Sequence, residues 1–179
     1  MIETERLILR KPKLSDAKGL QRAYGDPEVT EFIGRGETRD LTETRDWIKR
    51  QQERWKADGF GSLTIERKED KRVLGRTGFL VWNSETWQTG TLAEFGDDIG
   101  VVELGWVLAK EHWGQGYATE AALAARDHAF KELKLGRLIS LILRGNDRSV
   151  RVAEKIGARY VRDVGRDDWS VRLYAVNRP

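Results

Sequence analysis

A glycine-rich corner is the strongest chemical signal in this sequence. The stretch His112 to Ala122 reads HWGQGYATEAA and places Gly114 and Gly116 directly before a strongly helical run. The apolar run upstream, Val101 to Leu108, has the length and residue types of a strand. A corner between a strand and a helix points unpaired backbone N–H groups outward, and such groups bind anions. Glycines also serve as plain turn residues, so the pattern alone leaves both interpretations open.

Two well-known phosphate motifs do not fit this corner. A Walker A loop needs G-x-x-x-x-G-K-[ST], which the chain lacks. A dinucleotide fingerprint needs a third glycine where Thr119 stands, and it normally opens its domain rather than following a long β-rich region. The remaining interpretation is a pyrophosphate held by successive amides from Trp113 to Thr119, with help from the positive end of the following helix dipole.

The second half of the chain predicts a βαβ unit around this corner. We expect a strand at Val102 to Leu108, a helix at Tyr117 to Lys134 capped by Gly136, and a strand at Arg137 to Leu143. The helix carries small residues along one stripe, which lets it lie close to a sheet; they are Ala118, Ala121, Ala122, Ala125 and Ala129. Another helix from about Asp147 to Ile156 and two strands, RYVRDV and SVRLYAV, follow.

The first half of the chain predicts further strands and helices, which must complete the sheet that positions the corner. The expected elements are a strand at Arg6 to Lys11, a helix with Ser15 as N-cap that stops at Gly25, a helix at Leu41 to Lys56 ending at Gly59, and a hairpin formed by FGSLTIERK and RVLGRTGFLVW. We expect a long loop from Asn83 to Asp98. Trp82 and Trp87 flank it, and they are the tryptophans we expect nearest to a substrate.

Composition excludes several classes of protein. The 179 residues suit one domain, and no cysteine is present, which excludes disulfides and thiol-enzyme intermediates. With only two histidines we expect no metal site. The start of the chain and its apolar runs predict neither secretion nor a membrane span, so a cytoplasmic protein is expected. The 32 basic residues alternate with 29 acidic ones, which argues against a nucleic-acid partner.

Two motifs in order carry a family resemblance. ELGWVLAKEHWGQGYATEA, followed by GNDRSVRVAEKIGARYV, resembles the GNAT acetyltransferase superfamily, in particular the RimJ/RimL branch of ribosomal-protein alanine N-acetyltransferases. The opening TERLILRKPKLSDA is similar to that branch too. The resemblance implies an α/β (α+β) fold of one domain over residues 1–179. It also implies a mixed, mostly antiparallel sheet with helices on both faces and splayed strands at an acyl-CoA cleft.

The resemblance also implies acetyl-CoA as cosubstrate and no metal. The implied contacts to its pyrophosphate are Trp113, Gly114, Gln115, Gly116, Tyr117, Ala118 and Thr119, and those to its pantetheine arm are Trp106, Val107, Leu108 and Asn146. Trp113 stands where the family usually has Gln or Arg, which changes one side-chain contact but not the row of amides.

The leaving thiolate needs a proton donor. Many relatives use a tyrosine to protonate the leaving thiolate, but this chain has Ala153 there, so Ser149 is our candidate. Ser149 would equally well cap the helix that begins near Asp147. Since the chain has no cysteine, we expect the acceptor to attack acetyl-CoA directly in a ternary complex, with the amide of Val107 or Leu108 as oxyanion donor.

Glu103 is the candidate general base because it lies on the strand that feeds the cleft. Strand alternation puts it on one face with Val107, but the sequence leaves open which face meets the acceptor. Asp167 and Asp168 are alternatives, while His112 suits packing or phosphate contact better than proton transfer.

The acceptor itself stays open at this stage. Relatives imply a primary amine, either a protein N-terminus or a small molecule, and the fold alone does not choose between them. A non-catalytic acyl-CoA sensor and a basic nucleic-acid-binding domain are the competing hypotheses. A monomer and a homodimer are equally compatible with the sequence.

Overall fold

One twisted sheet organises the chain. The computed structural model describes residues 1–166 and 169–179, and within them the strands form a nine-stranded sheet in the order β1-β2-β3-β4-β6-β7-β9-β8, with β5 paired to β4. The strands are β1 Ile2–Glu3, β2 Leu7–Arg10, β3 Ser62–Arg67, β4 Val73–Asn83, β5 Thr89–Gly90, β6 Gly100–Leu108, β7 Arg137–Leu143, β8 Arg159–Arg166 and β9 Trp169–Asn177. Only β6 and β7 run parallel among these neighbours, which confirms the expected mixed, mostly antiparallel sheet.

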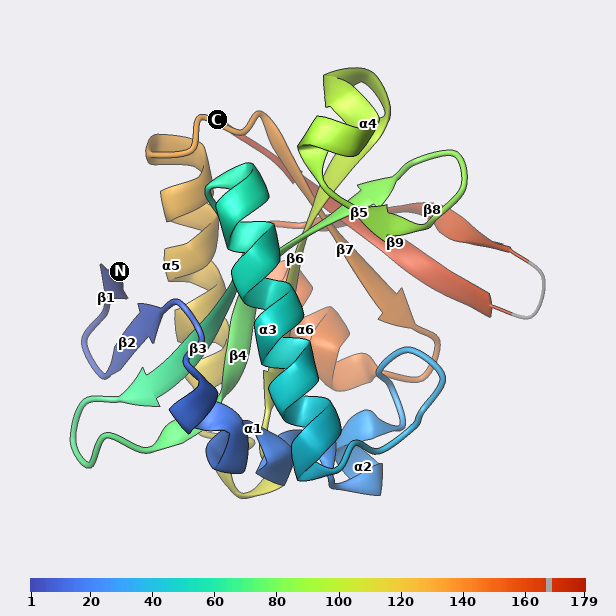
Figure 1. The fold of residues 1–179 in the computed structure, drawn as a ribbon. Coiled ribbons are helices and arrows are strands. Elements are labelled where there is room, and N and C mark those ends of the chain that lie inside the picture. Colours follow the sequence, from blue (N-terminus) through green and yellow to red (C-terminus); the bar gives the residue numbers. More distant parts are fainter. Residues whose placement is uncertain (167–168) are drawn as a thin grey trace.

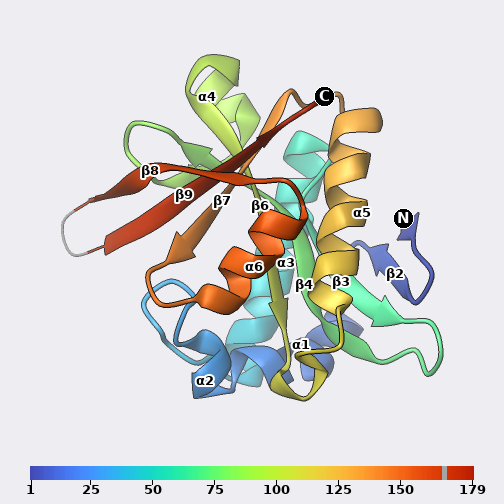
Figure 2. The same ribbon diagram turned by 180° about the vertical axis from the view of Figure 1, so that it is seen from behind.

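Helices cover both faces of the sheet, as expected (Figure 1, Figure 2). The helices are α1 Ala17–Tyr24, α2 Pro27–Thr30, α3 Leu41–Asp58, α4 Leu92–Ile99, α5 Tyr117–Lys131 and α6 Asp147–Lys155, with short 3-10 turns at Leu14–Asp16 and Lys110–His112. Figure 1 shows α3 and α1 in front of the sheet, whereas α5 and α6 lie behind it. The two halves of the sequence therefore contribute opposite layers.

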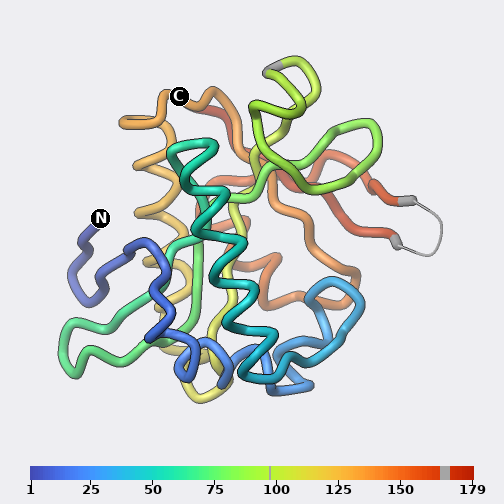
Figure 3. Tube along the Cα trace, viewed as in Figure 1, coloured from blue at the N-terminus to red at the C-terminus, as the bar shows by residue number. Residues whose placement is uncertain are grey.

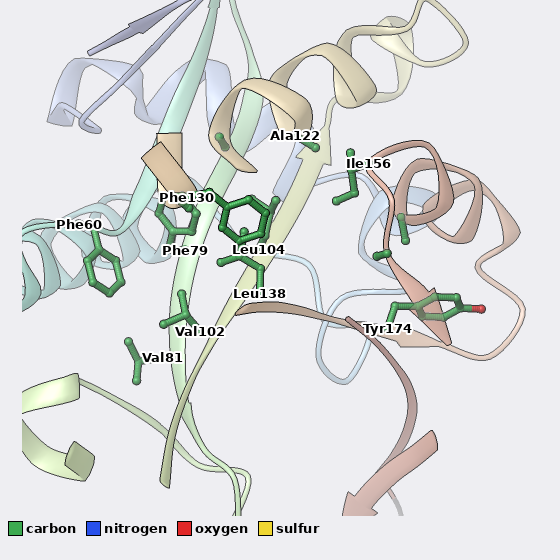
Figure 4. Packing of buried hydrophobic residues seen from close by; sticks show 14 of the residues in the cluster. Phe60, Phe79, Val81, Val102, Leu104, Ala122, Phe130, Leu138, Ile156 and Tyr174 are labelled. Atoms are coloured by element: carbon green, nitrogen blue, oxygen red, sulfur yellow. The ribbon is translucent and has the colours of Figure 1, made fainter. Parts of the chain in front are cut away.

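The βαβ unit predicted around the corner is present as β6, α5 and β7. Ala121, Ala122, Ala125 and Ala129 of α5 are all 0 % exposed, so the helix axis lies close to the sheet. Phe130, one position further, packs with Val102, Leu104 and other residues in the largest core cluster (Figure 4). Burial of this apolar surface fixes α5 against the centre of the sheet.

β6 and β7 are joined only around Glu103 and Leu104 among the described residues. Their single register pair is Glu103 with Ile139, and the Ser140 hydroxyl donates a hydrogen bond of 2.7 Å to the Leu104 carbonyl. By contrast, β6 pairs with β4 along its whole length, from Gly100 to Leu108. Beyond Glu103, therefore, β6 has one paired edge and one edge without a strand partner among the described residues. The ribbons of β6 and β7 diverge toward the end of β7 (Figure 1).

The segment predicted as a loop, Asn83 to Asp98, is partly helical, so that expectation was wrong. It contains β5 and α4, and Thr91 and Glu94 form a capping box at the start of α4. The Thr91 hydroxyl accepts from the Glu94 amide, and the Glu94 carboxylate accepts from the Thr91 amide. Gly96, with φ 71°, interrupts the helix.

Two predicted helix ends and one predicted cap residue also need correction. Ser15 is not the N-cap of α1, because it lies inside a 3-10 turn and α1 begins after Asp16. The helix at the corner ends at Lys131 rather than Lys134, and Lys134 with φ 58° takes the left-handed position expected of Gly136. The other predicted helix ends agree to within two residues, including Gly59, which has φ 74°.

A segment far away in sequence closes one side of the gap. The chain between α2 and α3 passes beside the turn that follows β7 (Figure 3). A Cβ built on Gly145 in that turn would lie 3.6 Å from the Phe32 ring. Residues on both sides of the sheet therefore reach the space between β6 and β7.

Gly78 offers a test of the close approach between β3 and β4. It has φ 109°, and a Cβ there would lie 2.6 Å from the Gly61 carbonyl oxygen. Gly78→Ala should lower the free energy of unfolding by about 2–4 kcal/mol, because it adds both an overpacked contact and an unfavourable backbone conformation. Urea denaturation measures this. Gly136→Ala is the matched control, since nothing lies within 4 Å of its Cβ position and its φ is not positive; equal stability of the two variants would contradict the packing argument.

Candidate active site

A cleft of about 1060 Å³ occupies the gap between β6 and β7. Its walls come from the end of β6, the glycine corner, the start of α6, one side of α3 and the segment after α2. The cleft thus passes through the sheet where the two parallel strands separate. Of the predicted site residues, all except Gln115 line it.

The glycine corner leaves a row of amides free. Among the described residues, the backbone N–H groups of residues 114 to 119 donate to no protein acceptor, while the next amide, of Glu120, bonds to the Gly116 carbonyl at 3.0 Å. Gly114 and Gly116 have φ values of 74° and 82°, a conformation that side chains with a Cβ rarely adopt. Free amides at the start of a 15-residue helix favour a bound anion.

An ion pair between Arg6, near the start of the chain, and Glu120 fixes the position of the corner. The Arg6 guanidinium contacts the Glu120 carboxylate at 2.6 Å and donates to the Gln115 carbonyl at 3.0 Å. The Thr4 hydroxyl also donates to Glu120, at 2.6 Å. Burial opposes ionisation of Glu120, but these hydrogen bonds keep its pKa below the usual value. Sequence reasoning missed Arg6, because nothing local links it to a corner more than a hundred residues away.

Trp113 is fixed at the position where relatives usually carry Gln or Arg. Its indole Nε1 donates to the Leu108 carbonyl at 3.0 Å, which ties the corner to the end of β6. The Arg148 guanidinium of α6 lies 4.3 Å above the Trp113 ring and also lines the cleft. A cation thus stacks on the aromatic ring beside the free amides. The Gln115 side chain turns away and donates to the Glu111 carbonyl.

The end of β6 presents its backbone to the cleft while its side chains pack elsewhere. Trp106 packs against the cluster under α5, Val107 packs with Ala23 and Val29, and Leu108 packs under the corner. All three residues line the cleft. Their edge toward β7 has no register partner among the described residues, so it can accept an added extended chain.

Asn146, and not Ser149, caps the helix α6. Asn146 is the N-cap of α6, and its side-chain oxygen accepts from the Ser149 amide at 3.1 Å. Ser149 is therefore not the cap of the helix. Both residues line the cleft. Ala153, which stands at the tyrosine position of many relatives, is 0 % exposed and belongs to the core under α5.

Glu103 lies on the face of β6 opposite to α5, which answers the question of strand alternation. Val102 and Leu104 are in the core under α5, so Glu103 points to the side of α3, together with Leu80, its register partner on β4. The Trp82 indole donates to Glu103 at 2.7 Å. Burial raises the pKa of Glu103, although Trp82, the charge of Arg76 and the Leu141 amide favour its ionised form.

The other titratable candidates differ in their settings. His112 is 5 % exposed and lines the cleft, and its Nε2 has no hydrogen-bond partner within the part of the chain that the structure describes. Burial lowers the pKa of His112, so the ring is neutral near pH 7. Asp167 and Asp168 lie outside the described residues. Trp82 lines the cleft, whereas Trp87 packs against the cluster between β7 and β9.

Sequence reasoning missed a set of arginines on the α3 side of the cleft. Arg50 and Arg54 lie on the same side of α3 as Trp47 and Gln51, and all four line the cleft. Their spacing of three and four residues was a readable signal for one helix face. Arg39 and Arg76 reach the same wall from distant parts of the chain, so no local pattern could have predicted them.

Two further properties concern the described residues only. Among the side chains that the structure describes, no group of three or more histidine or acidic residues is placed to hold a metal ion. Within residues 1–166 and 169–179, every helix is too short or too polar to cross a membrane.

Comparison with known proteins gives a consistent result. The chain matches the acetyltransferase (GNAT) domain family over residues 6–159. It is 30 % identical to the uncharacterized N-acetyltransferase p20 of Bacillus licheniformis over 153 residues, 86 % of this chain and 79 % of that protein. It superposes on a crystal structure of an acetyltransferase from Agrobacterium tumefaciens with a TM-score of 0.77 and 32 % identity, covering 98 % of this chain and 93 % of that one.

The ribosomal L7/L12 N-acetyltransferase RimL, solved in complex with coenzyme A, shares the fold. The TM-score is 0.77 at 15 % identity, and the superposition covers 97 % of this chain and 95 % of RimL. The resemblance read from the two sequence motifs is confirmed at the level of family and fold. The chain belongs to the GNAT acetyltransferase family, as an N-acetyltransferase whose cosubstrate is acetyl-CoA.

Proposed function

We propose that this enzyme transfers the acetyl group of acetyl-CoA to a primary amine by direct attack within a ternary complex. The observation that carries this proposal is the cleft between β6 and β7, which combines free amides at one end with a half-buried carboxylate, Glu103, along its wall. The chain contains no cysteine to carry an acetyl intermediate, which supports direct attack.

The corner suits the pyrophosphate of acetyl-CoA. In this proposal the amides of residues 114 to 119 donate to the phosphate oxygens, and the Arg148 charge above Trp113 adds attraction from α6. The pantetheine arm then runs along residues 106 to 108 in the manner of an added strand, with Asn146 on its other side. His112 lies beneath the corner, where a neutral ring can accept or donate one hydrogen bond.

The chemistry requires three proton or charge movements. Glu103 accepts the proton of the attacking ammonium through water, and the resulting neutral amine attacks the thioester carbonyl. The amide of Val107 or Leu108 stabilises the negative oxygen of the tetrahedral intermediate. The carbon–sulfur bond then breaks, and the Ser149 hydroxyl donates a proton to the thiolate and takes up the surplus proton of the attacking nitrogen, each directly or through water. An amide and coenzyme A with a free thiol result.

An amine panel tests the proposed reaction itself. Purified protein mixed with acetyl-CoA and a series of amines and peptides should release free thiol only when an accepted amine is present, and the acetylated amine should appear in equal amount by mass spectrometry. Binding of acetyl-CoA without thiol release for any amine would instead indicate an acyl-CoA sensor. An acetylated protein that accumulates without acceptor would contradict direct attack.

Removal of the proposed base should affect turnover and its pH dependence. Glu103→Gln is expected to lower kcat roughly 10²–10⁴-fold, because a glutamine cannot accept the proton. Burial raises the pKa of Glu103, so the wild-type rate should fall, as pH decreases, at a higher pH than an ordinary carboxylate would give. The variant should lose this ionisation, while that of the amine remains in both proteins. An unchanged pH profile and kcat would remove Glu103 from the mechanism.

Ser149 is tested by its separate effects on rate and on affinity. Ser149→Ala should lower kcat roughly 10²-fold and leave acetyl-CoA affinity by calorimetry within about threefold, since the Asn146 cap bonds to the Ser149 backbone amide and stays intact. A parallel loss of rate and affinity would indicate a binding or structural role for the hydroxyl. Full activity of the variant would exclude Ser149 as the proton donor.

A further inference from the structure

Four arginines surround the half of the cleft that lies on the α3 side of the sheet: Arg39, Arg50, Arg54 and Arg76. None of them forms an ion pair with a carboxylate among the described residues. Glu103 lies in the same half, and a Cβ built on Gly105 would lie 3.0 Å from an Arg76 nitrogen and 3.8 Å from a Glu103 oxygen. Arg76 is thus the arginine that lies next to the proposed base, Glu103.

One tyrosine holds two of these arginines in place. The Arg76 Nε donates to the Tyr24 hydroxyl at 3.0 Å, and the Arg39 guanidinium lies 4.5 Å above the Tyr24 ring. The Nη1 of Arg39 is inaccessible to water and has no hydrogen-bond partner in the described part of the chain. A tyrosine orients these groups but leaves their positive charge unneutralised.

The other two arginines are neighbours on α3. Arg54 donates to the Thr89 hydroxyl at 3.1 Å. Burial and the charge of Arg50 lower the pKa of Arg54, against the opposing effect of Asp58 and Glu94. Two cations one helical turn apart repel each other, so holding both at a cleft wall costs free energy.

A structural arginine in this protein has a different environment. Arg10, whose side chain is 16 % exposed, contacts Asp16 and Glu66 at 2.8 Å each. Among the described residues, the carboxylates that line the cleft are fewer than its basic side chains: Glu28, Glu31, Glu103 and Asp147 stand against six arginines and Lys155. Glu28 is moreover paired with Lys110, outside the cleft lining. The cleft therefore has an excess of positive charge, to which the four arginines of the α3 side contribute, and an anionic ligand can balance it.

We propose that the acceptor is a primary amine that carries its own carboxylate or phosphate group, which these arginines bind while the amine faces Glu103. This inference rests on the proposed function, because it assigns the acceptor of the same reaction. Arginine is suited to the role, since its planar guanidinium binds carboxylate and phosphate with two parallel hydrogen bonds. The same charges disfavour a polycationic amine such as an aminoglycoside.

Matched acceptors that differ in charge test this inference. With N-terminal amines, Ala-Glu-Glu-amide should give a kcat/KM roughly tenfold or more above Ala-Gln-Gln-amide, and Ala-Lys-Lys-amide should be the poorest. With small amines, β-alanine should exceed β-alaninamide by a similar factor. A preference in only one series identifies whether a peptide or a small molecule is the source of the anion. Equal rates within both series, or a preference for the basic peptide, would overturn the inference.

The double variant Arg50→Gln, Arg54→Gln should remove most of the preference for acidic acceptors and leave acetyl-CoA affinity unchanged. Arg45→Gln is the matched control, because Arg45 is exposed on the same helix and does not line the cleft. If the double variant keeps the preference for acidic acceptors, Arg50 and Arg54 of α3 do not bind the anionic group.

A binding experiment separates this inference from the proposed reaction. Calorimetry on protein saturated with coenzyme A should show tighter binding of Ala-Glu-Glu-amide than of Ala-Gln-Gln-amide, whether or not transfer occurs. If no peptide or small amine is acetylated but the acidic peptide still binds more tightly, the proposed reaction fails and the anionic site stands. If the two peptides bind equally, the anionic site is excluded.

Discussion

The separation of β6 from β7 is the constraint on which the rest of the site depends. β6 is a central strand paired with β4 over its whole length, yet it meets β7 at a single register pair, Glu103 with Ile139. A central strand with a free edge leaves backbone groups unpaired, which costs free energy unless a ligand or water satisfies them. The Ser140 hydroxyl on Leu104 and the packing of α5 hold the two strands together just above the opening. The cleft exists because β6 and β7 are joined at Glu103 and Leu104 but are separated from residue 106 onward.

The alternation of side chains along β6 divides the cleft into two chemical environments. Residues 102 and 104 fix α5 to the sheet, and α5 in turn presents the free amides of the corner. Residue 103, on the other face, is a carboxylate among arginines and the indole of Trp82. An anionic cosubstrate and an anionic acceptor would thus be bound from opposite sides of one strand, with the thioester between them. That arrangement is our proposal for how one parallel strand pair organises both substrates.

The sequence predicted most of what depends on local pattern. The βαβ unit, the hairpin of β3 and β4, the glycine corner and the start of α6 all follow from residue periodicity and turn residues, and they agree with the structure. Helix α4 was missed although its capping box, Thr91 to Glu94, is readable, because the helix is short and broken at Gly96. Ser15 and Gly136 were assigned as caps on residue type alone, and neighbouring residues took those roles.

The parts of the site that could not be predicted depend on long-range contacts. The face of Glu103 could not be chosen, because both faces of β6 are covered and alternation has no preferred phase in such a strand. Arg6 at the corner, Arg148 on Trp113 and Arg39 on Tyr24 join segments that no local rule connects. The amide row was predictable because glycine conformation is a local property, whereas the charge of the acceptor wall emerges only when α3, β4 and the segment after α2 meet.

A crystal structure of the protein with coenzyme A tests the central claim most directly. Our account predicts pyrophosphate oxygens within hydrogen-bonding distance of amides in the 114–119 row, and a pantetheine arm that lies along residues 106–108 in the gap between β6 and β7. Coenzyme A bound elsewhere, with the corner and the strand gap both unoccupied, would contradict it.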